Sequence, residues 1–169
     1  MDIILPSNSL ISSIIALSIT RRTNCKITIK NQNLNSFGRL YSLNYFSKKY
    51  LDDLGLWKLL DKSKITPYKK IEIFKNSKKT IEFQASDVNL DFLGYIINED
   101  DLAEKISNTV FDNQHINKSD KPTISSEKNS INIVSNFNDI FLNENQKNYF
   151  EKDYAQTAVN ITFEHSEKN

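Results

Sequence analysis

The beginning of the sequence carries the pattern that most constrains how this chain can fold. A short apolar run, Ile3-Ile4-Leu5, precedes the polar turn Pro6-Ser7-Asn8-Ser9, and apolar residues then recur at helical spacing over residues 10–17. An alternating segment at residues 26–30 predicts a second strand. The order strand, tight turn, helix, strand is that of a βαβ unit, whose two strands lie parallel because a helix connects them.

The turn of this unit lacks the glycines that a dinucleotide-binding βαβ unit carries. Such a unit has the pattern G-x-G-x-x-G, which lets the backbone approach a pyrophosphate and lets the helix pack on the strand. Here the three positions are Ser7, Ser9 and Ser12. The acidic residue that normally ends the second strand and binds a ribose is replaced by Lys30. The sequence therefore predicts the architecture of a nucleotide site without its binding residues.

Charge and cysteine content exclude several functional classes. The net charge of +1 over 169 residues gives no electrostatic basis for binding nucleic acid or an anionic membrane. The single cysteine, Cys25, excludes an intrachain disulfide and a cysteine-clustered metal site. The two histidines, His115 and His165, lie in polar segments, so we expect surface residues and no metal site. The sequence has no transmembrane segment, and Asp2 and Pro6 do not fit a signal peptide, so we expect a cytoplasmic protein.

The middle of the chain predicts one helical region, a hairpin, a strand and a second helix. Residues 42–60 carry apolar side chains at helical steps, with an interruption and helix cap at Gly55. Residues 70–83 contain two strands joined by a polar turn, and residues 94–97 form another short strand. Asn98 then precedes an acidic first helical turn, which predicts an N-cap.

The last third of the chain is less regular. Residues 112–130 are rich in Asn, Lys, Ser and Asp, which predicts a flexible polar loop. Short apolar runs follow at residues 131–134 and 140–142. Residues 154–163 read as one further strand, and the remaining residues form a polar tail.

Five blocks of the sequence resemble a known enzyme family. They are Arg39-Leu40-Tyr41-Ser42-Leu43-Asn44, Leu51-Asp52-Asp53-Leu54-Gly55-Leu56-Trp57, Ile71-Glu72-Ile73-Phe74, Leu93-Gly94-Tyr95-Ile96-Ile97 and Asp153-Tyr154-Ala155-Gln156-Thr157-Ala158-Val159. Their order and spacing resemble those of the flavin-dependent ubiquinone-biosynthesis hydroxylases, which are aromatic-ring monooxygenases with the p-hydroxybenzoate-hydroxylase-like fold. The resemblance covers nearly the whole chain but only the N-terminal part of that longer family.

The resemblance implies where an FAD cofactor would bind, and most of those positions are changed here. The glycines of the family correspond to Ser7, Ser9 and Ser12, a vestigial loop in which we expect no flavin, and the acid corresponds to Lys30. The first FAD-contacting arginine is kept as Arg39, which is either a vestigial flavin or substrate contact or part of a structural salt bridge. The arginine at a later helix start is Asp100, and the Ala-Asp-Gly segment has become residues 135–139.

The expected fold is therefore α/β: a Rossmann-like βαβ remnant of an FAD domain with a small antiparallel β-sheet, lacking the family's C-terminal half. Residues 1–111 would form this degenerate FAD-binding-like domain, with the antiparallel strands of residues 70–97 inserted. Residues 112–130 would be the flexible loop, and residues 131–169 would add the remaining strands of the same domain and the tail.

Two functional classes follow from the resemblance. The first is a non-catalytic relative that acts as a binding or scaffolding subunit in quinone biosynthesis, without a cofactor or catalytic residues. The second is an FAD-dependent aromatic-ring monooxygenase with an atypical or partner-completed flavin site. A split enzyme would keep its glycine loop, so the substitutions favour the first class.

The absent half of the family implies a protein partner, which is a second copy or a quinone-pathway subunit. Such a partner could also hold the chain at the inner membrane. Apolar side chains on the strand that would lead into that half are the candidate contacts. They are Tyr154, Val159, Ile161 and Phe163.

Overall fold

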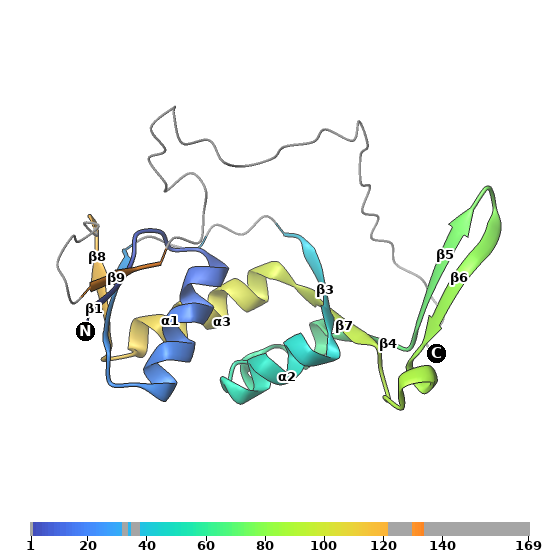
Figure 1. The fold of residues 1–169 in the computed structure, drawn as a ribbon, viewed down its shortest axis with the longest axis horizontal. Helices are drawn as coiled ribbons and strands as arrows, with labels where there is room; N and C mark the ends of the chain where they lie inside the picture. Colours follow the sequence, from blue (N-terminus) through green and yellow to red (C-terminus); the bar gives the residue numbers. More distant parts are fainter. Residues whose placement is uncertain (1, 32–33, 35–37, 122–129, 134–169) are drawn as a thin grey trace.

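A computed structural model of the chain describes residues 2–31, 34, 38–121 and 130–133. Its first layer is a parallel sheet with the strand order β8-β2-β1-β9 (Figure 1). The strands are β1 (Asp2–Leu5), β2 (Lys26–Lys30), β8 (Ile116–Ser119) and β9 (Ser130–Asn132). Strand β1 pairs in parallel with β2, with Ile3 opposite Ile27 and Leu5 opposite Ile29. The predicted βαβ unit is confirmed.

Three α-helices are described. They are α1 (Leu10–Arg22), α2 (Tyr45–Asp53) and α3 (Glu99–Asp112). Helix α1 connects β1 to β2 and packs against β2 and α3. Helix α3 begins where predicted, because the Asn98 side chain accepts hydrogen bonds from the backbone N–H groups of Asp100 and Asp101. None of the helices in the described part of the chain is long and apolar enough to cross a membrane.

A second sheet is antiparallel and has the order β3-β7-β4. Its strands are β3 (Leu40–Asn44), β4 (Thr66–Tyr68) and β7 (Gly94–Asn98). A separate hairpin consists of β5 (Lys70–Lys75) and β6 (Lys78–Gln84), and it projects beyond β4 in Figure 1. Short 3-10 turns lie at Trp57–Leu59, Lys62–Lys64 and Ala85–Val88.

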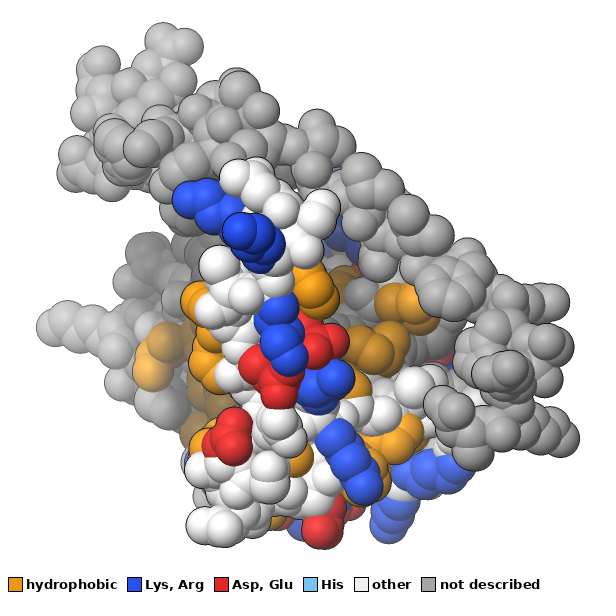
Figure 2. All heavy atoms as spheres, turned by 90° about the vertical axis from the view of Figure 1, so that its right-hand side faces the viewer, with side chains coloured by type: hydrophobic (Ala, Val, Ile, Leu, Met, Phe, Trp, Pro, Cys, Tyr) orange, Lys and Arg blue, Asp and Glu red, His pale blue; other side chains and the backbone are white. Residues whose placement is uncertain are grey.

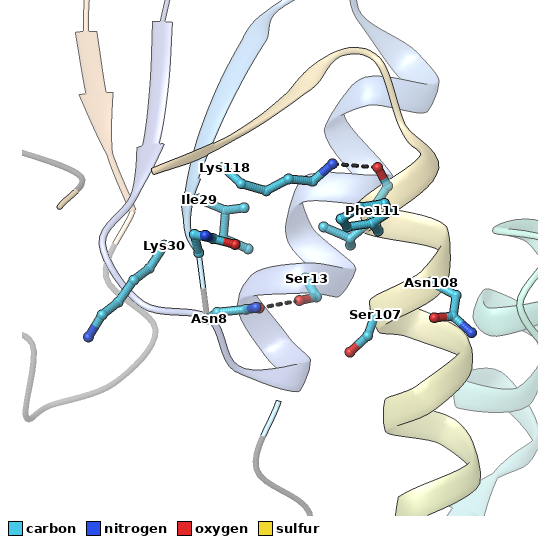
Figure 3. Close-up of a pocket in the computed structure, with 10 residues that line it drawn as sticks. Asn8, Ser13, Ile29, Lys30, Ser107, Asn108, Phe111 and Lys118 are labelled. Carbon is cyan, nitrogen blue, oxygen red and sulfur yellow. Dashed lines mark hydrogen bonds between the residues drawn. The ribbon is translucent and has the colours of Figure 1, made fainter. Parts of the chain in front are cut away.

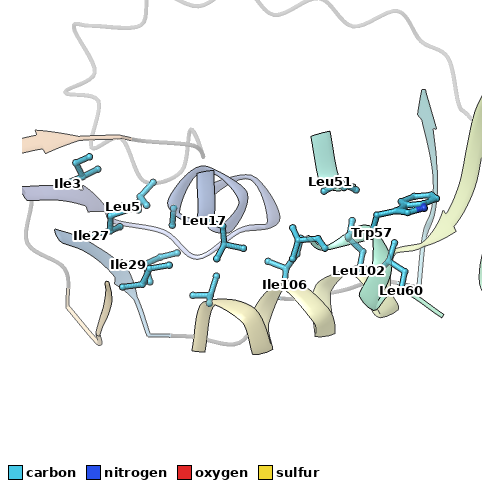
Figure 4. Close-up of a cluster of buried hydrophobic side chains, with 14 of the residues drawn as sticks. Ile3, Leu5, Leu17, Ile27, Ile29, Leu51, Trp57, Leu60, Leu102 and Ile106 are labelled. Carbon is cyan, nitrogen blue, oxygen red and sulfur yellow. The ribbon is translucent and has the colours of Figure 1, made fainter. Parts of the chain in front are cut away.

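One hydrophobic core joins the two sheets (Figure 4). At one end, Leu5, Ile27 and Ile29 of the parallel sheet are fully buried. At the other end lie Trp57 and Leu60, and the α3 residue Ile106 lies between the two ends (Figure 4). Trp57 is buried in this core. Because α3 contributes to both ends, it fixes the parallel sheet relative to the antiparallel one.

Two expectations about the middle of the chain need correction. Residues 42–44 are not helical but belong to β3, because β7 offers them an antiparallel hydrogen-bonding partner; α2 starts only after the cap residue Asn44. The helix does end before Gly55, whose φ of +76° is left-handed, as the capping prediction requires. The antiparallel strands of residues 70–97 form two sheets rather than one, since β7 pairs with β3 and β4 and not with the hairpin.

The expected loop over residues 112–130 is wrong for residues 116–119, which form β8. This edge strand pairs in parallel with β2 and buries one apolar residue, Ile116. A single buried side chain among polar neighbours leaves no periodic pattern to detect. The predicted strand at residues 154–163 lies outside the described residues, as do residues 135–139 and the candidate contacts Tyr154, Val159, Ile161 and Phe163.

Candidate functional site

The turn between β1 and α1 lies at the carboxyl end of β1, the edge at which open α/β sheets bind ligands. The structure brings the three predicted serines together there. Ser9 is the N-cap of α1, and its Oγ accepts a hydrogen bond from the Ser12 backbone N–H at 3.1 Å. A side-chain oxygen of the protein therefore satisfies one of the N–H groups that a phosphate would otherwise meet.

The serine hydroxyls fill the inside of this turn. The Oγ of Ser12 lies 3.1 Å from the Oγ of Ser7 and 3.0 Å from the Oγ of Ser9. Ser12 is 0% exposed and Ser7 is 5% exposed. Next to them, the Ser13 hydroxyl donates to Asn8 Oδ1 at 2.8 Å. Side chains bonded to one another thus occupy the space that glycines would leave open to a pyrophosphate.

Lys30 stands at the end of β2, beside a small polar cleft (Figure 3). The cleft has a volume of about 150 Å³, and its lining includes Asn8, Ser13, Ile29 and Phe111. In Figure 3 the Lys30 side chain points away from Ser13 and Phe111. Pockets for drug-sized ligands and cofactors measure roughly 300–1,000 Å³, so this cleft is too small for a dinucleotide.

The second region expected to contact FAD is the start of α3, and there carboxylates bind the chain itself. The Gly38 N–H donates to Asp100 Oδ1 at 3.0 Å, and the Arg39 N–H donates to Glu99 Oε2 at 3.3 Å. The Glu99 N–H in turn donates to the Arg39 carbonyl oxygen at 2.8 Å. Glu99 is only 3% exposed. Asp100 thus holds the segment before β3 against α3, where the resemblance implies an arginine.

These carboxylates also set the charge of the region. Glu99, Asp100 and Asp101 form the first turn of α3, where negative side chains interact favourably with the helix dipole. The same negative charge disfavours an anionic ligand at this helix end.

Glu99 also accepts a hydrogen bond from the Tyr41 hydroxyl at 2.6 Å. This hydrogen bond raises the pKa of Tyr41, and partial burial and the charge of Glu99 raise it further, while the nearby Arg39 lowers it. The contact therefore stabilises the fold below the ordinary phenol pKa of about 10 and is lost as the pH rises through the higher folded-state value.

We expect Tyr41 to ionise above the ordinary tyrosine pKa in an ultraviolet pH titration, because its hydroxyl donates a hydrogen bond to the Glu99 carboxylate. Tyr41→Phe should remove a step of the titration that lies above this ordinary value. Loss of a step at the ordinary value instead would show that the contact with Glu99 does not form in solution.

An apolar groove of about 680 Å³ lies between α1, β3 and α2. Its lining is Leu10, Ile11, Ile14, Tyr41, Leu43, Phe46, Ser47, Tyr50, Leu51 and Leu102. No local pattern indicates this groove, because the spacing of Leu10, Ile11 and Ile14 is also that of a helix face buried in the core. Nothing in the described residues shows what covers it.

The remaining site candidates are structural or exposed. His115 is exposed in the turn before β8, and Cys25 is partly buried just before β2. Within the ranges that the structure describes, His, Cys, Asp and Glu side chains form no group of three that could hold a metal ion.

No protein-family model matches this sequence, and no curated protein sequence matches it. Similar folds are found among solved structures. One is PqsL, a probable FAD-dependent monooxygenase from Pseudomonas aeruginosa, with a TM-score of 0.57 and 11% identity over 70% of this chain and 32% of that one. Another is 2-methyl-3-hydroxypyridine-5-carboxylic acid oxygenase, with a TM-score of 0.51 and 14% identity over 70% and 30% of the two chains.

A third is the p-nitrophenol 4-monooxygenase PnpA from Pseudomonas putida, with a TM-score of 0.50 and 9% identity over 69% and 29% of the two chains. This chain spans about a third of the length of these structures. At such identities the likeness establishes the fold alone. The expected α/β fold, matching a part of the FAD-monooxygenase fold, is confirmed.

Proposed function

We propose that this chain is a non-catalytic relative of the FAD-dependent ubiquinone-biosynthesis hydroxylases that acts as a binding or scaffolding subunit. The fold likeness supports the relation to FAD-dependent monooxygenases. The five sequence blocks that resemble the ubiquinone-pathway family support the narrower assignment.

One observation carries the non-catalytic part of the proposal: the turn before α1 is closed by its own serine side chains. The Ser12 hydroxyl lies 3.1 Å from that of Ser7 and 3.0 Å from that of Ser9, and Ser12 is fully buried. Opening this turn to a pyrophosphate would break these contacts and expose a buried hydroxyl. No glycine in the turn gives a pyrophosphate room instead, because the glycines that the structure describes are Gly38, Gly55 and Gly94.

The other expected FAD positions support the same conclusion. Lys30 cannot accept the ribose hydrogen bonds that an acid would accept. Asp100 binds the Gly38 N–H and brings a negative charge where the pyrophosphate would need a positive one. The main chain of Arg39 is tied to Glu99, which supports a structural role for Arg39 over a flavin contact.

We propose further that the chain forms one domain and acts together with a protein partner. Strand β9 joins the same sheet as β1, which supports the assignment of residues 131–169 to the domain of residues 1–111. The partner would be a second copy of the chain or a quinone-pathway subunit, with Tyr154, Val159, Ile161 and Phe163 as candidate contacts. The lone Cys25 supports a location in the reducing cytoplasm.

Flavin binding tests the proposal directly. We expect the purified full-length chain to be colourless and to leave the fluorescence of added FAD unchanged. After incubation with excess FAD and desalting, the protein fraction should show no flavin absorbance. A flavoprotein monooxygenase carried through the same steps serves as the positive control.

Stoichiometric flavin after desalting would overturn the proposal in favour of the second class, an FAD-dependent monooxygenase with an atypical or partner-completed site. The substitution Ser12→Ala distinguishes specific from adventitious flavin. It removes the central hydroxyl of the turn, so it should alter the affinity only if FAD binds beside α1.

A further inference from the structure

The hairpin of β5 and β6 is amphipathic and has no second layer in the described part of the chain. Its turn, Asn76 and Ser77, has φ values of 50° and 61°, as a two-residue type I′ turn requires. Among the described strands, these two pair only with each other. An isolated two-stranded hairpin is marginally stable in water, so an uncovered one is a candidate contact surface.

The register places four apolar residues on one face of the hairpin. Ile71 lies opposite Phe83, and Ile73 lies opposite Ile81. Alternate residues of a strand share a face, so these two pairs are neighbours. Their exposed fractions are 41%, 50%, 44% and 47%. We call these residues, together with the tip pair Lys75 and Lys78, the apolar face of the hairpin.

The opposite face carries basic and acidic side chains that pair with one another. Lys79 pairs with Glu72 at 3.3 Å and also with Glu82, and Lys70 pairs with Glu72 at 3.2 Å. Two lysines and two glutamates leave no net charge on this face. Figure 2 shows the mixed blue and red side chains on this side of the molecule, with hydrophobic side chains beside them.

The net positive charge of the hairpin therefore lies at the tip of the apolar face. Lys75 and Lys78 lie opposite each other beside the turn, and both are exposed. In the described structure neither lysine side chain forms a hydrogen bond or an ion pair, and the register places no acidic residue on their face. The whole-chain charge of +1 hides this arrangement, because it averages the two faces with the rest of the protein.

We propose that this face of the hairpin binds an anionic lipid surface. Exposed isoleucine and phenylalanine side chains would enter the interface, while the lysines at the tip contact lipid phosphates and keep their ammonium groups in the headgroup region.

The charge distribution favours this occupant over a second copy of the chain. If two apolar faces packed together, the tip lysines would find no acidic partner on either face, whichever way the hairpins run, which is unfavourable. A flat anionic surface neutralises them instead. The proposal concerns the hairpin alone and does not depend on whether the chain binds flavin.

Vesicle flotation with the full-length chain tests the proposal. We expect it to float with vesicles that contain phosphatidylglycerol and to stay behind with phosphatidylcholine alone. Each basic residue near such a surface contributes about 1 kcal/mol, so Lys75→Gln with Lys78→Gln should weaken binding about 30-fold. Added salt should weaken binding of the unaltered chain.

Two further variants separate the proposal from simpler explanations. Ile73→Thr keeps a strand-forming residue but removes apolar area, so binding should fall while the circular dichroism spectrum is kept. Lys48→Gln with Lys105→Gln lowers the net charge by the same amount as the tip double variant, but the changes lie on α2 and α3. This control should leave binding within about twofold of the unaltered chain if the tip lysines act locally.

The proposal is overturned if the chain fails to float with anionic vesicles, or if the two lysine double variants lose binding equally. It is also overturned if light scattering shows a dimer that Ile73→Thr dissociates and no vesicle binding, because the face would then bind a second copy.

Discussion

Gly94→Ala is expected to destabilise the protein by about 3 kcal/mol, at the upper end of overpacking effects. Gly94 lies in β7, the central strand of the antiparallel sheet, opposite Asn44 of β3 and Tyr68 of β4. A Cβ atom at this position would lie 2.3 Å from the Leu43 carbonyl oxygen and 2.4 Å from the Tyr68 hydroxyl oxygen.

Neither neighbour of Gly94 can move away cheaply. The Leu43 oxygen belongs to the backbone of β3, which is paired with β7 along its length. The Tyr68 hydroxyl forms a hydrogen bond with Ser42 at 2.9 Å, and its ring carbon Cζ would lie 2.7 Å from the new Cβ. An added methyl group must therefore separate strands or displace the ring.

Urea denaturation of the unaltered protein and of Gly94→Ala measures the loss in the free energy of unfolding. Gly55→Ala is the matched control. At Gly55 the nearest atoms to a new Cβ are 3.8 Å away, so only the left-handed φ of +76° has a cost, about 1–2 kcal/mol. Equal losses at the two glycines would mean that Tyr68 does not pack across β7.

Ile106→Ala is expected to cost about 3–4 kcal/mol, since Ile106 is fully buried between the two ends of the core. The cavity would form where α3 joins the parallel sheet to the antiparallel one. Ile106→Val should cost only about 1 kcal/mol, because it removes a single methylene group.

Thermal and urea unfolding should rank these variants in the same order. Phe111→Ala serves as a control on the same helix, since this side chain is 73% exposed and should cost less than about 1 kcal/mol. A loss at Ile106 no larger than that at Phe111 would show that α3 does not connect the two sheets in one core.

Local patterns in the sequence were sufficient for several elements. The alternation in residues 26–30, the cap residue Asn98 and the turn before Lys78 each act through neighbours a few residues away. The replacement of glycines by serines in this turn was also predictable from the sequence, because the three positions lie close together in the chain. Its closure by mutual hydrogen bonds was not, since that depends on how the three side chains rotate.

Other features of the candidate site required the assembled fold. The bond from Gly38 to Asp100 joins residues 62 positions apart, and no local pattern predicts it. The apolar groove between α1 and α2 exists because these helices do not cover each other's exposed side chains. The amphipathic hairpin was predicted as a hairpin, but its uncovered face depends on β7 pairing elsewhere.

The sequence by itself determined the βαβ opening, the loss of the glycine loop and the acidic start of α3, because turns, caps and short-range periodicity depend on adjacent residues. Only the tertiary structure decided that residues 42–44 and 116–119 are strands, because β7 and β2 supply their hydrogen-bonding partners from distant parts of the chain. Strand formation is a pairing event, so it follows the partner as much as the segment's own residues.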